Sequence, residues 1–428
     1  MQKWRGGIII MKNKIESNVS YYNSHFRTRF AKAKNAFLYS DQDEQYIDFF
    51  SAAGSLNYGH NNEYIKSIIV EYVEGDNIIQ GLDMDTVAKE EFFSCFKENI
   101  LEPRGLDYKL QLSGPAGTNA VEAALRLARK VTGRNGIFSL TGSFHGMSTS
   151  ALSVSSTKSS RLTGLPSDNG VTFIPFSVTD MDGYDPITFI KFLLNHEHSG
   201  VETPAAIIIE TLQAEGGVKP LSNEVLRSLQ DICCEHKILL ICDDIQVGCY
   251  RTGTFFSFEE SGIVPDIAVL SKSLSGYGIP MSILLMKPSL DVWGSGEYNG
   301  TFRGNQLAFV GAKSAIEFGI SNNITQMISK SSEIIKTSLE KIASKLDKDV
   351  EIRGKGMIWG IDLNAYNIEG LALECAEECF NNGLIIEVCG TGQNVLKLMP
   401  PLTIEEDVLL KGLEIIENAV LVKVAKRD

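Results

Sequence analysis

A lysine and an aspartate each follow an apolar stretch that has the composition of a buried strand. Lys272 comes just after the apolar run 267–270, and Asp243 directly follows the run 238–242. Ligands of parallel sheets bind where the carboxyl ends of the strands meet, so we expect both side chains at that edge. A partly desolvated lysine is neutral and nucleophilic, which predicts covalent chemistry at an amine.

A third motif lies upstream, where the small residues of 113–120 open a helical stretch. Gly117 and Thr118 can present backbone N–H groups and a hydroxyl to a dianion at the helix start. Such helix entries are common without any ligand, so the turn alone is a weak signal. Together, the three motifs offer an amine for a Schiff base, a carboxylate for a pyridine nitrogen and a phosphate site. They predict pyridoxal 5′-phosphate (PLP) as the cofactor.

Residues near these motifs are candidates for contacts with the PLP ring. Phe144, which precedes His145, could stack on the ring, and packing in the core is the alternative. Gln246 could bond the ring hydroxyl or be a surface turn amide. Asp243 itself could cap a helix, although its neighbour Asp244 is the better candidate for that role.

Two acids and one loop are candidates for substrate or phosphate contacts. Glu210 follows an apolar strand and Glu215 comes shortly after it, and each is either a site carboxylate or a plain loop acid. The loop 300–305 contains Thr301 and Arg303 and could reach a phosphate or a carboxylate. The six histidines have no metal-binding spacing, so we expect no catalytic metal.

The hydrophobic pattern predicts the elements that position these residues. Strands and helices alternate from about residue 105 to 290, and near-continuous apolar strands indicate a buried, mostly parallel α/β sheet. After about residue 320 the pattern becomes that of a smaller α+β unit. We therefore predict an N-terminal segment that joins the small domain, a large PLP-binding domain and a C-terminal small domain, with the bounds 1–50, 51–320 and 321–428.

Composition limits the classes of partner and the compartment. The chain of 428 residues is long enough for two or three packed domains, and its net charge of −13 disfavours nucleic acid and acidic membranes. The eight cysteines form no CxxC pair, which favours a reducing cytoplasm. We see no membrane span, and the apolar run near Met1 is too short for a signal peptide; a start at Met11 would make 1–10 extraneous.

Taken in chain order, the motifs form a set that resembles the class III (ω-type) aminotransferases of PLP fold type I. The resemblance covers nearly all of residues 20–420. It implies a seven-stranded, mostly parallel sheet with helices on both faces, and a smaller α+β domain from the N- and C-terminal segments. The set consists of 114–122, 144–146, 210–217, 243–248, 251–253, 271–272 and 300–305.

The resemblance also implies a role for each cofactor candidate. Lys272 forms the Schiff base, and Asp243 pairs with the pyridine nitrogen. The family builds its site across a subunit interface, so at least a homodimer is implied, with Thr301 reaching the phosphate of the other subunit. The other implied contacts are stacking by Phe144, ring-hydroxyl bonding by Gln246, phosphate binding by Gly117 and Thr118, and further cofactor contacts by His145 and Glu210.

For the substrate, the resemblance assigns Glu215 as a gating glutamate. This residue pairs with a basic side chain when the ω-end of a diamine is in the site, and swings aside for the α-carboxylate of glutamate. Many relatives carry an arginine where this chain has Lys397, and a lysine cannot make a bidentate carboxylate clamp. Arg303 is our hypothesis for that clamp.

Within the family, some segments are most similar to the branch that serves ectoine and diaminobutyrate biosynthesis. These segments are 56–62, 81–86, 103–111, 299–305 and 397–402. They imply transamination between L-glutamate and L-aspartate 4-semialdehyde, giving L-2,4-diaminobutyrate and 2-oxoglutarate. The alternatives are an ω-aminotransferase for ornithine, 4-aminobutyrate or a β-amino acid, an aminomutase of the same fold, and a non-catalytic binding or regulatory module. The intact pair of Lys272 and Asp243 argues against the last.

Overall fold

The computed structural model describes residues 15–157, 170–176 and 184–425, so the proposed start at Met11 lies outside the described residues. A seven-stranded sheet forms its centre, in the order β4-β12-β11-β10-β7-β5-β6. Only β12 runs antiparallel to its neighbours, which confirms the predicted mostly parallel sheet. The strands are β4 (Lys109–Gly114), β5 (Ile137–Leu140), β6 (Val171–Ile174), β7 (Ala206–Ile209), β10 (Leu239–Asp243), β11 (Ile267–Leu270) and β12 (Ser282–Met286).

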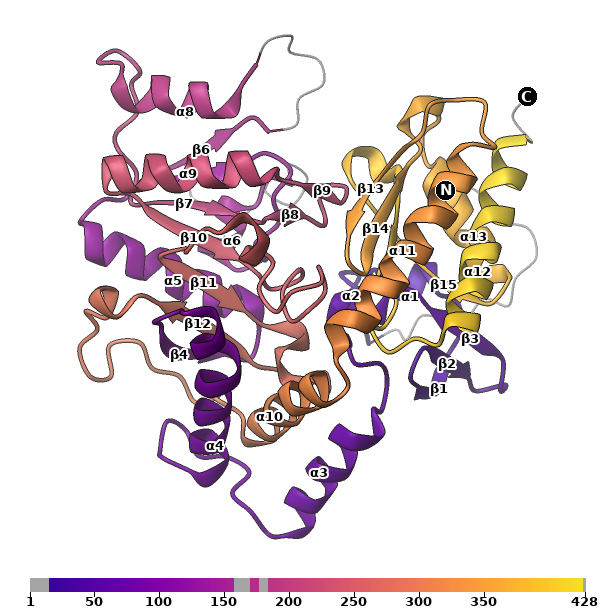
Figure 1. The fold of residues 1–428 in the computed structure, drawn as a ribbon, viewed down its shortest axis with the longest axis horizontal. Coiled ribbons are helices and arrows are strands. Elements are labelled where there is room, and N and C mark those ends of the chain that lie inside the picture. Colours follow the sequence, from indigo (N-terminus) through magenta and orange to yellow (C-terminus); the bar gives the residue numbers. More distant parts are fainter. Residues whose placement is uncertain (1–14, 158–169, 177–183, 426–428) are drawn as a thin grey trace.

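The inner strands β7, β10, β11 and β12 are buried on both faces, and this explains why they are almost entirely apolar. Successive side chains of a strand point to opposite faces. In β7, Ile207 and Ile209 join the core that includes helix α9 (Asn223–His236), whereas Ile208 joins the core of α5 (Gly117–Thr132) on the other face. Figure 1 shows α9, with α8 (Pro186–Asn195), on one side of the sheet and α5 on the other. The predicted two-sided covering by helices is therefore confirmed.

A smaller layer lies beside the large sheet, to the right in Figure 1. Its four-stranded sheet has the order β13-β14-β17-β16 and contacts helices α11 and α12, and α13 packs against both of these helices. The elements are β13 (Glu351–Lys355), β14 (Ile358–Asp362), β16 (Glu387–Cys389), β17 (Val395–Leu398), α11 (Ile324–Ala343), α12 (Leu371–Asn381) and α13 (Glu406–Ala425).

The N-terminal segment pairs with this C-terminal part of the chain. Strands β1 (Phe30–Lys34), β2 (Phe37–Ser40) and β3 (Gln45–Asp48) form an antiparallel meander, and β3 pairs in parallel with β15 (Leu384–Ile385). The segment 384–398 thus forms three short strands that belong to two sheets. The change of sheet between β15 and β16 occurs at Ile386, which is itself buried.

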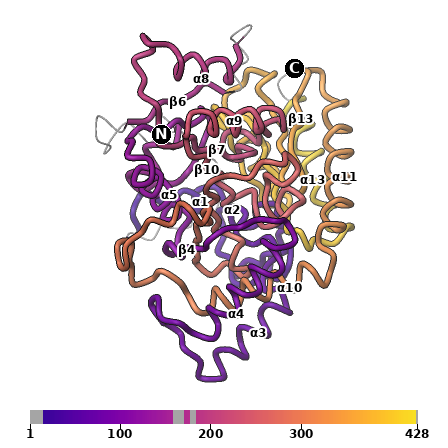
Figure 2. The backbone as a smooth tube through the Cα atoms, turned by 60° about the vertical axis from the view of Figure 1, so that its left-hand side comes forward, coloured from indigo at the N-terminus to yellow at the C-terminus, as the bar shows by residue number. Residues whose placement is uncertain are grey.

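Three helices pack together at one end of the molecule, at the bottom of Figures 1 and 2. They are α3 (Glu63–Glu74), α4 (Val87–Phe96) and α10 (Gln306–Ser321). In the described ranges, no helix combines the length and the apolar character that a membrane crossing requires. The remaining elements are short: α1 (Tyr22–His25), α2 (Ser51–Gly54), α6 (Thr149–Val154), β8 (Leu212–Gln213) and β9 (Lys219–Pro220), with turns of 3₁₀- or π-helix between larger elements.

Candidate active site

Lys272 is held in an unusual backbone conformation at the end of β11. Its φ angle is +48°, a left-handed value that costs a non-glycine residue about 1–2 kcal/mol. The flanking serines fix the turn: Ser271 Oγ donates to the Met281 carbonyl at 2.7 Å, and Ser273 Oγ donates to the Gly54 carbonyl at 2.8 Å. Such strain persists where surrounding contacts over-determine the backbone, as at functional sites.

The Lys272 side chain opens on a cavity of about 1290 Å³. Burial lowers the pKa of its amine, while the negative charge of Glu215 opposes this shift. A lowered pKa increases the neutral, nucleophilic fraction of the amine near neutral pH. Phe144 and Glu215 line the same cavity, as the sequence predicted for a common site.

Asp243 ends β10 with its carboxylate held from two sides. His145 Nδ1 lies 2.7 Å from Oδ2, and the Ile245 N–H donates to Oδ1 at 3.1 Å. Burial lowers the pKa of His145, but the hydrogen bond and charge of Asp243 outweigh it and raise that pKa above its ordinary value. His145 is therefore a positioning residue for Asp243, and its other ring nitrogen, Nε2, is buried without a hydrogen-bond partner in the described ranges.

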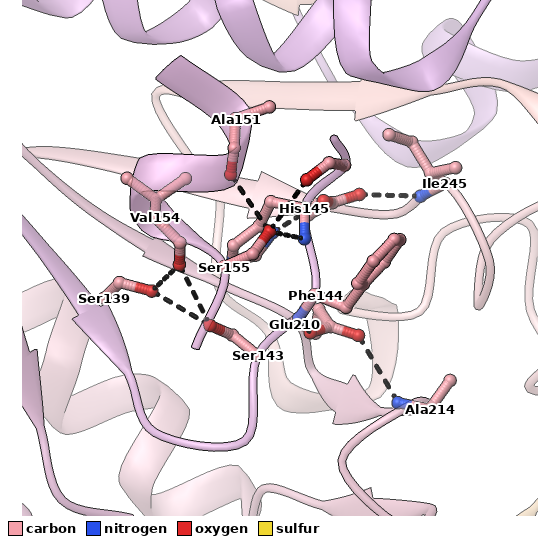
Figure 3. A network of polar contacts seen from close by, with 12 residues as sticks. Ser139, Ser143, Phe144, His145, Ala151, Val154, Ser155, Glu210, Ala214 and Ile245 are labelled. Atoms are coloured by element: carbon pink, nitrogen blue, oxygen red, sulfur yellow. Dashed lines mark hydrogen bonds and ion pairs between the residues drawn. The ribbon is translucent and has the colours of Figure 1, made fainter. Parts of the chain in front are cut away.

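Glu210 holds the backbone around Phe144, as Figure 3 shows. Its Oε1 accepts from the Phe144 N–H at 2.9 Å and its Oε2 from the Ala214 N–H at 3.3 Å. The next amide, that of His145, donates to Ser155 Oγ at 2.8 Å. Burial, with help from the charge of Asp243, raises the pKa of Glu210 to about 7. Glu210 thus orients the loop that carries Phe144 and His145.

Replacing Glu210 by glutamine is expected to flatten the pH dependence of stability. A carboxyl whose pKa is raised in the folded state stabilises the fold at low pH, and this contribution is lost as the pH rises from about 4.3 to the folded value of about 7. The wild type should lose about 1.4 kcal/mol per pH unit through Glu210 in this window, and Glu210→Gln should not.

Urea unfolding of both PLP-loaded proteins at about pH 5 and about pH 8 measures this difference. Asp244, whose pKa burial also raises to about 7, titrates in both proteins and cancels in the comparison. The exposed Glu202→Gln is the matched control. Equal pH slopes in the wild type and Glu210→Gln would contradict the raised pKa.

The expectation that Asp244 caps a helix was wrong. Turns, rather than a helix, follow β10, and the Asp244 side chain is buried. Its carboxylate accepts from the Ser257 N–H at 3.0 Å and from the Ser257 hydroxyl. Gly248 packs so closely that an added Cβ would lie 2.6 Å from the Asp244 carbonyl oxygen. Asp244 therefore links the tight loop after β10 to the segment that contains Ser257.

A left-handed turn forms another wall of the cavity. Ser51, Ala52 and Ala53 have φ values of 48°, 48° and 57°, and Gly54 follows at 77°. The Asp48 Oδ1 atom accepts the N–H groups at both Phe50 and Ser51, at 2.8 and 2.9 Å. We did not anticipate this turn from the sequence, where the only signal is a run of small residues after an apolar strand.

Gln246 contacts this turn, because its Nε2 donates to the Ala53 carbonyl at 3.0 Å. Gln246 also forms a hydrogen bond that lowers the pKa of Glu215, a shift led by the charges of Lys397 and Lys272 against the effect of burial. The interpretation of Gln246 as an exposed surface amide is therefore wrong, since the residue is buried beside the cavity. Its contact with the ring hydroxyl stays a prediction.

The predicted phosphate turn lies against both the Asp243 turn and the Phe144 loop. Helix α5 begins at Gly117, where an added Cβ would lie 2.8 Å from Ile245 Cδ1. Thr118 Oγ1 lies 2.5 Å from Ser148 Oγ, and a Cβ on Gly146 would lie 2.6 Å from that Thr118 oxygen. The helix start, which favours an anion, is thus adjacent to the groups expected to hold the ring.

Lys397 is completely buried between two carboxylates. Its Nζ lies 2.5 Å from Glu215 Oε1 and 3.0 Å from Glu387 Oε2. Tyr22 Oη donates to the other oxygen of Glu387 at 2.7 Å. Burial lowers the pKa of Lys397, but the two carboxylates outweigh it and raise that pKa well above its ordinary value. Glu387 and Tyr22 line the cavity, and sequence reasoning missed both.

The structure does not bring Thr301 and Arg303 to this cavity among the described residues of the chain. One guanidinium nitrogen of Arg303 lies 2.7 Å from Asp83 Oδ2, and another donates to the Tyr298 carbonyl. Gln80 Nε2 donates to the Thr301 carbonyl at 3.2 Å. The carboxylate clamp by Arg303 stays a prediction, and within one chain Asp83 already occupies this guanidinium.

Comparison with known proteins gives the family. The family model for class III aminotransferases matches residues 19–420. The chain belongs to the class III aminotransferases. It is 46% identical to a diaminobutyrate–2-oxoglutarate transaminase from Vibrio parahaemolyticus, over 96% of this chain and 97% of the relative. A protein of the same name from Halalkalibacterium halodurans is 45% identical, over 97% and 96% of the two chains.

The fold of this class III aminotransferase matches solved structures at lower sequence identity. The ornithine aminotransferase from Toxoplasma gondii superposes with a TM-score of 0.84 at 22% identity, covering 97% of this chain and 93% of the other. The cofactor of the class III aminotransferase is PLP, and the residues present fit it. Lys272 offers a partly buried amine that lines the cavity, Asp243 a fixed carboxylate, and Gly117 begins a helix beside them.

Proposed function

We propose that this class III aminotransferase transfers an amino group between L-glutamate and L-aspartate 4-semialdehyde, giving L-2,4-diaminobutyrate and 2-oxoglutarate. The observation that carries the proposal is the full-length similarity, at 46% and 45% identity, to proteins named diaminobutyrate–2-oxoglutarate transaminase. The cavity agrees with it, because Lys272 and Glu215 line the cavity and the Lys397 ammonium lies directly behind Glu215, 2.5 Å from its carboxylate. Ectoine synthesis is one route that would consume the product.

The residues of this chain divide the work of the reaction. PLP, when bound, supplies an electron sink that makes a C–H bond next to the substrate nitrogen acidic. Lys272 Nζ carries that proton between the substrate carbon and the cofactor. Asp243, held by His145, keeps a positive charge on the ring nitrogen favourable. Lys397 binds a substrate carboxylate when Glu215 moves away.

The proposed substrates can be tested by following the absorption band of the lysine-bound cofactor. Adding L-2,4-diaminobutyrate to the PLP-loaded protein should remove the band, and adding 2-oxoglutarate should restore it. A band that ignores diaminobutyrate but responds to ornithine, 4-aminobutyrate or a β-amino acid would reassign the substrate. Product formation without any keto acid would instead indicate an aminomutase.

We further propose that the enzyme is at least a homodimer with shared sites in the cytoplasm. Exposed apolar side chains in the 78–87 segment and at Phe302 support the dimer, because large exposed apolar patches mark interaction surfaces. The contacts Gln80–Thr301 and Asp83–Arg303 join these two segments. The eight cysteines, all of which are described, are free thiols, as a reducing compartment favours.

A further inference from the structure

The two carboxylates that hold Lys397 are not equivalent. Glu215 lies in the turn that follows β8, and its side chain is 31% exposed to the cavity. Glu387 lies on strand β16, is 8% exposed, and stands directly opposite Lys397 in the antiparallel register of β16 and β17. The Glu387 carboxylate is also fixed by Tyr22 Oη at 2.7 Å. Glu215 can therefore move while Glu387 stays.

The fixed carboxylate changes what Lys397 offers to a substrate. A lysine ammonium is a compact single charge, and Glu387 already compensates it at 3.0 Å. When Glu215 leaves, an incoming carboxylate must bind close to Glu387, and like charges at such distances repel. An arginine fork would present separate nitrogens to two carboxylates, whereas the single nitrogen of Lys397 holds both carboxylates close to each other.

We propose that Glu387 is a specificity-determining residue that weakens binding of an α-carboxylate at Lys397. The inference rests on the proposed function, in which Lys397 receives the α-carboxylate of L-glutamate. The ω-end of diaminobutyrate carries no carboxylate beside its reacting carbon, so it needs no exchange with Glu215. Glu387 therefore shifts the balance of the shared site toward the diamine and limits the time that glutamate or 2-oxoglutarate occupies it.

The removal of this charge by Glu387→Gln tests the inference. The dissociation constant of L-glutamate, from the concentration dependence of its half-reaction, should fall about tenfold. Glutarate, which has both carboxylates of glutamate and no amine, should also bind about tenfold tighter in a competition or thermal-shift measurement. The constant for diaminobutyrate should stay within about twofold. The Glu202→Gln variant, which removes an exposed carboxylate outside this site, is the matched control and should not tighten glutarate.

The band of the lysine-bound cofactor verifies that each variant is folded and loaded. If Glu387→Gln does not fold, Glu387→Asp withdraws the carboxylate from Lys397 and should tighten glutarate by a few-fold. Unchanged or weaker glutarate binding in a folded variant would overturn the inference and leave Glu387 as a support for Lys397. If the wild type ignores diaminobutyrate, the proposed function fails, and the glutarate result still decides the role of Glu387.

Discussion

The Lys272→Ala variant is expected to lose about 10³-fold or more of the rate of both half-reactions. Lys272 is the amine in the cavity whose pKa burial lowers and whose backbone is held in a strained conformation. In the proposed mechanism, the variant loses both the covalent partner for PLP and the group that carries the proton, and general acid–base catalysis alone contributes about 10²- to 10⁴-fold. Single-turnover absorbance measurements with each amino donor follow the loss.

The loss has a spectroscopic signature that a structural defect would not give. Lys272→Ala should still take up PLP, through the Asp243 and Gly117 parts of the site, but without the band of the lysine-bound cofactor. Lys287, which forms a half-exposed ion pair with Asp266 at 2.7 Å, provides the control: Lys287→Ala should keep both band and rate. Turnover of Lys272→Ala within tenfold of the wild type would show that another group carries the proton.

The positions of Lys272 and Asp243 could be predicted because strand ends are encoded locally. Apolar runs that stop at polar residues define both ends, and parallel pairing of β10 with β11 places Asp243 opposite Val269. The helix start at Gly117 is likewise a local signal, and the structure packs it against Ile245. Positions that depend on such local signals can be predicted from the sequence alone.

Other features depend on register or on distant contacts, and local patterns do not encode them. Glu387 faces Lys397 because β16 and β17 pair in one register, and a shift of one residue would turn Glu387 to the other face. Tyr22 reaches Glu387 from the far end of the chain. Asp244 looks like a helix cap in sequence, yet its partner Ser257 comes from a later loop. Fold-level pairing decides each of these contacts.

The Asp243→Asn variant is expected to lose about 10²- to 10³-fold of the rate, comparable to the loss of one preorganised electrostatic contact. Asparagine has nearly the same shape but no charge, so a protonated ring nitrogen is no longer favoured and the electron sink weakens. The Ile245 N–H can still donate to the side-chain oxygen, which keeps the turn formed. The Lys272 amine remains, so the band of the lysine-bound cofactor should persist while single-turnover rates fall.

The same substitution should change the titration of His145, which separates a charge effect from a folding defect. Asp243 raises the pKa of His145 against the effect of burial, so in Asp243→Asn burial prevails and the imidazole loses its proton at lower pH. A pH titration of the ring by NMR measures this shift. Asp244→Asn is the neighbouring control, because Asp244 binds Ser257 and should leave both the rate and the His145 titration unchanged. A normal rate in Asp243→Asn would mean that the shape of this side chain, and not its charge, holds the ring. The protonated ring nitrogen would then have to be stabilised by another group.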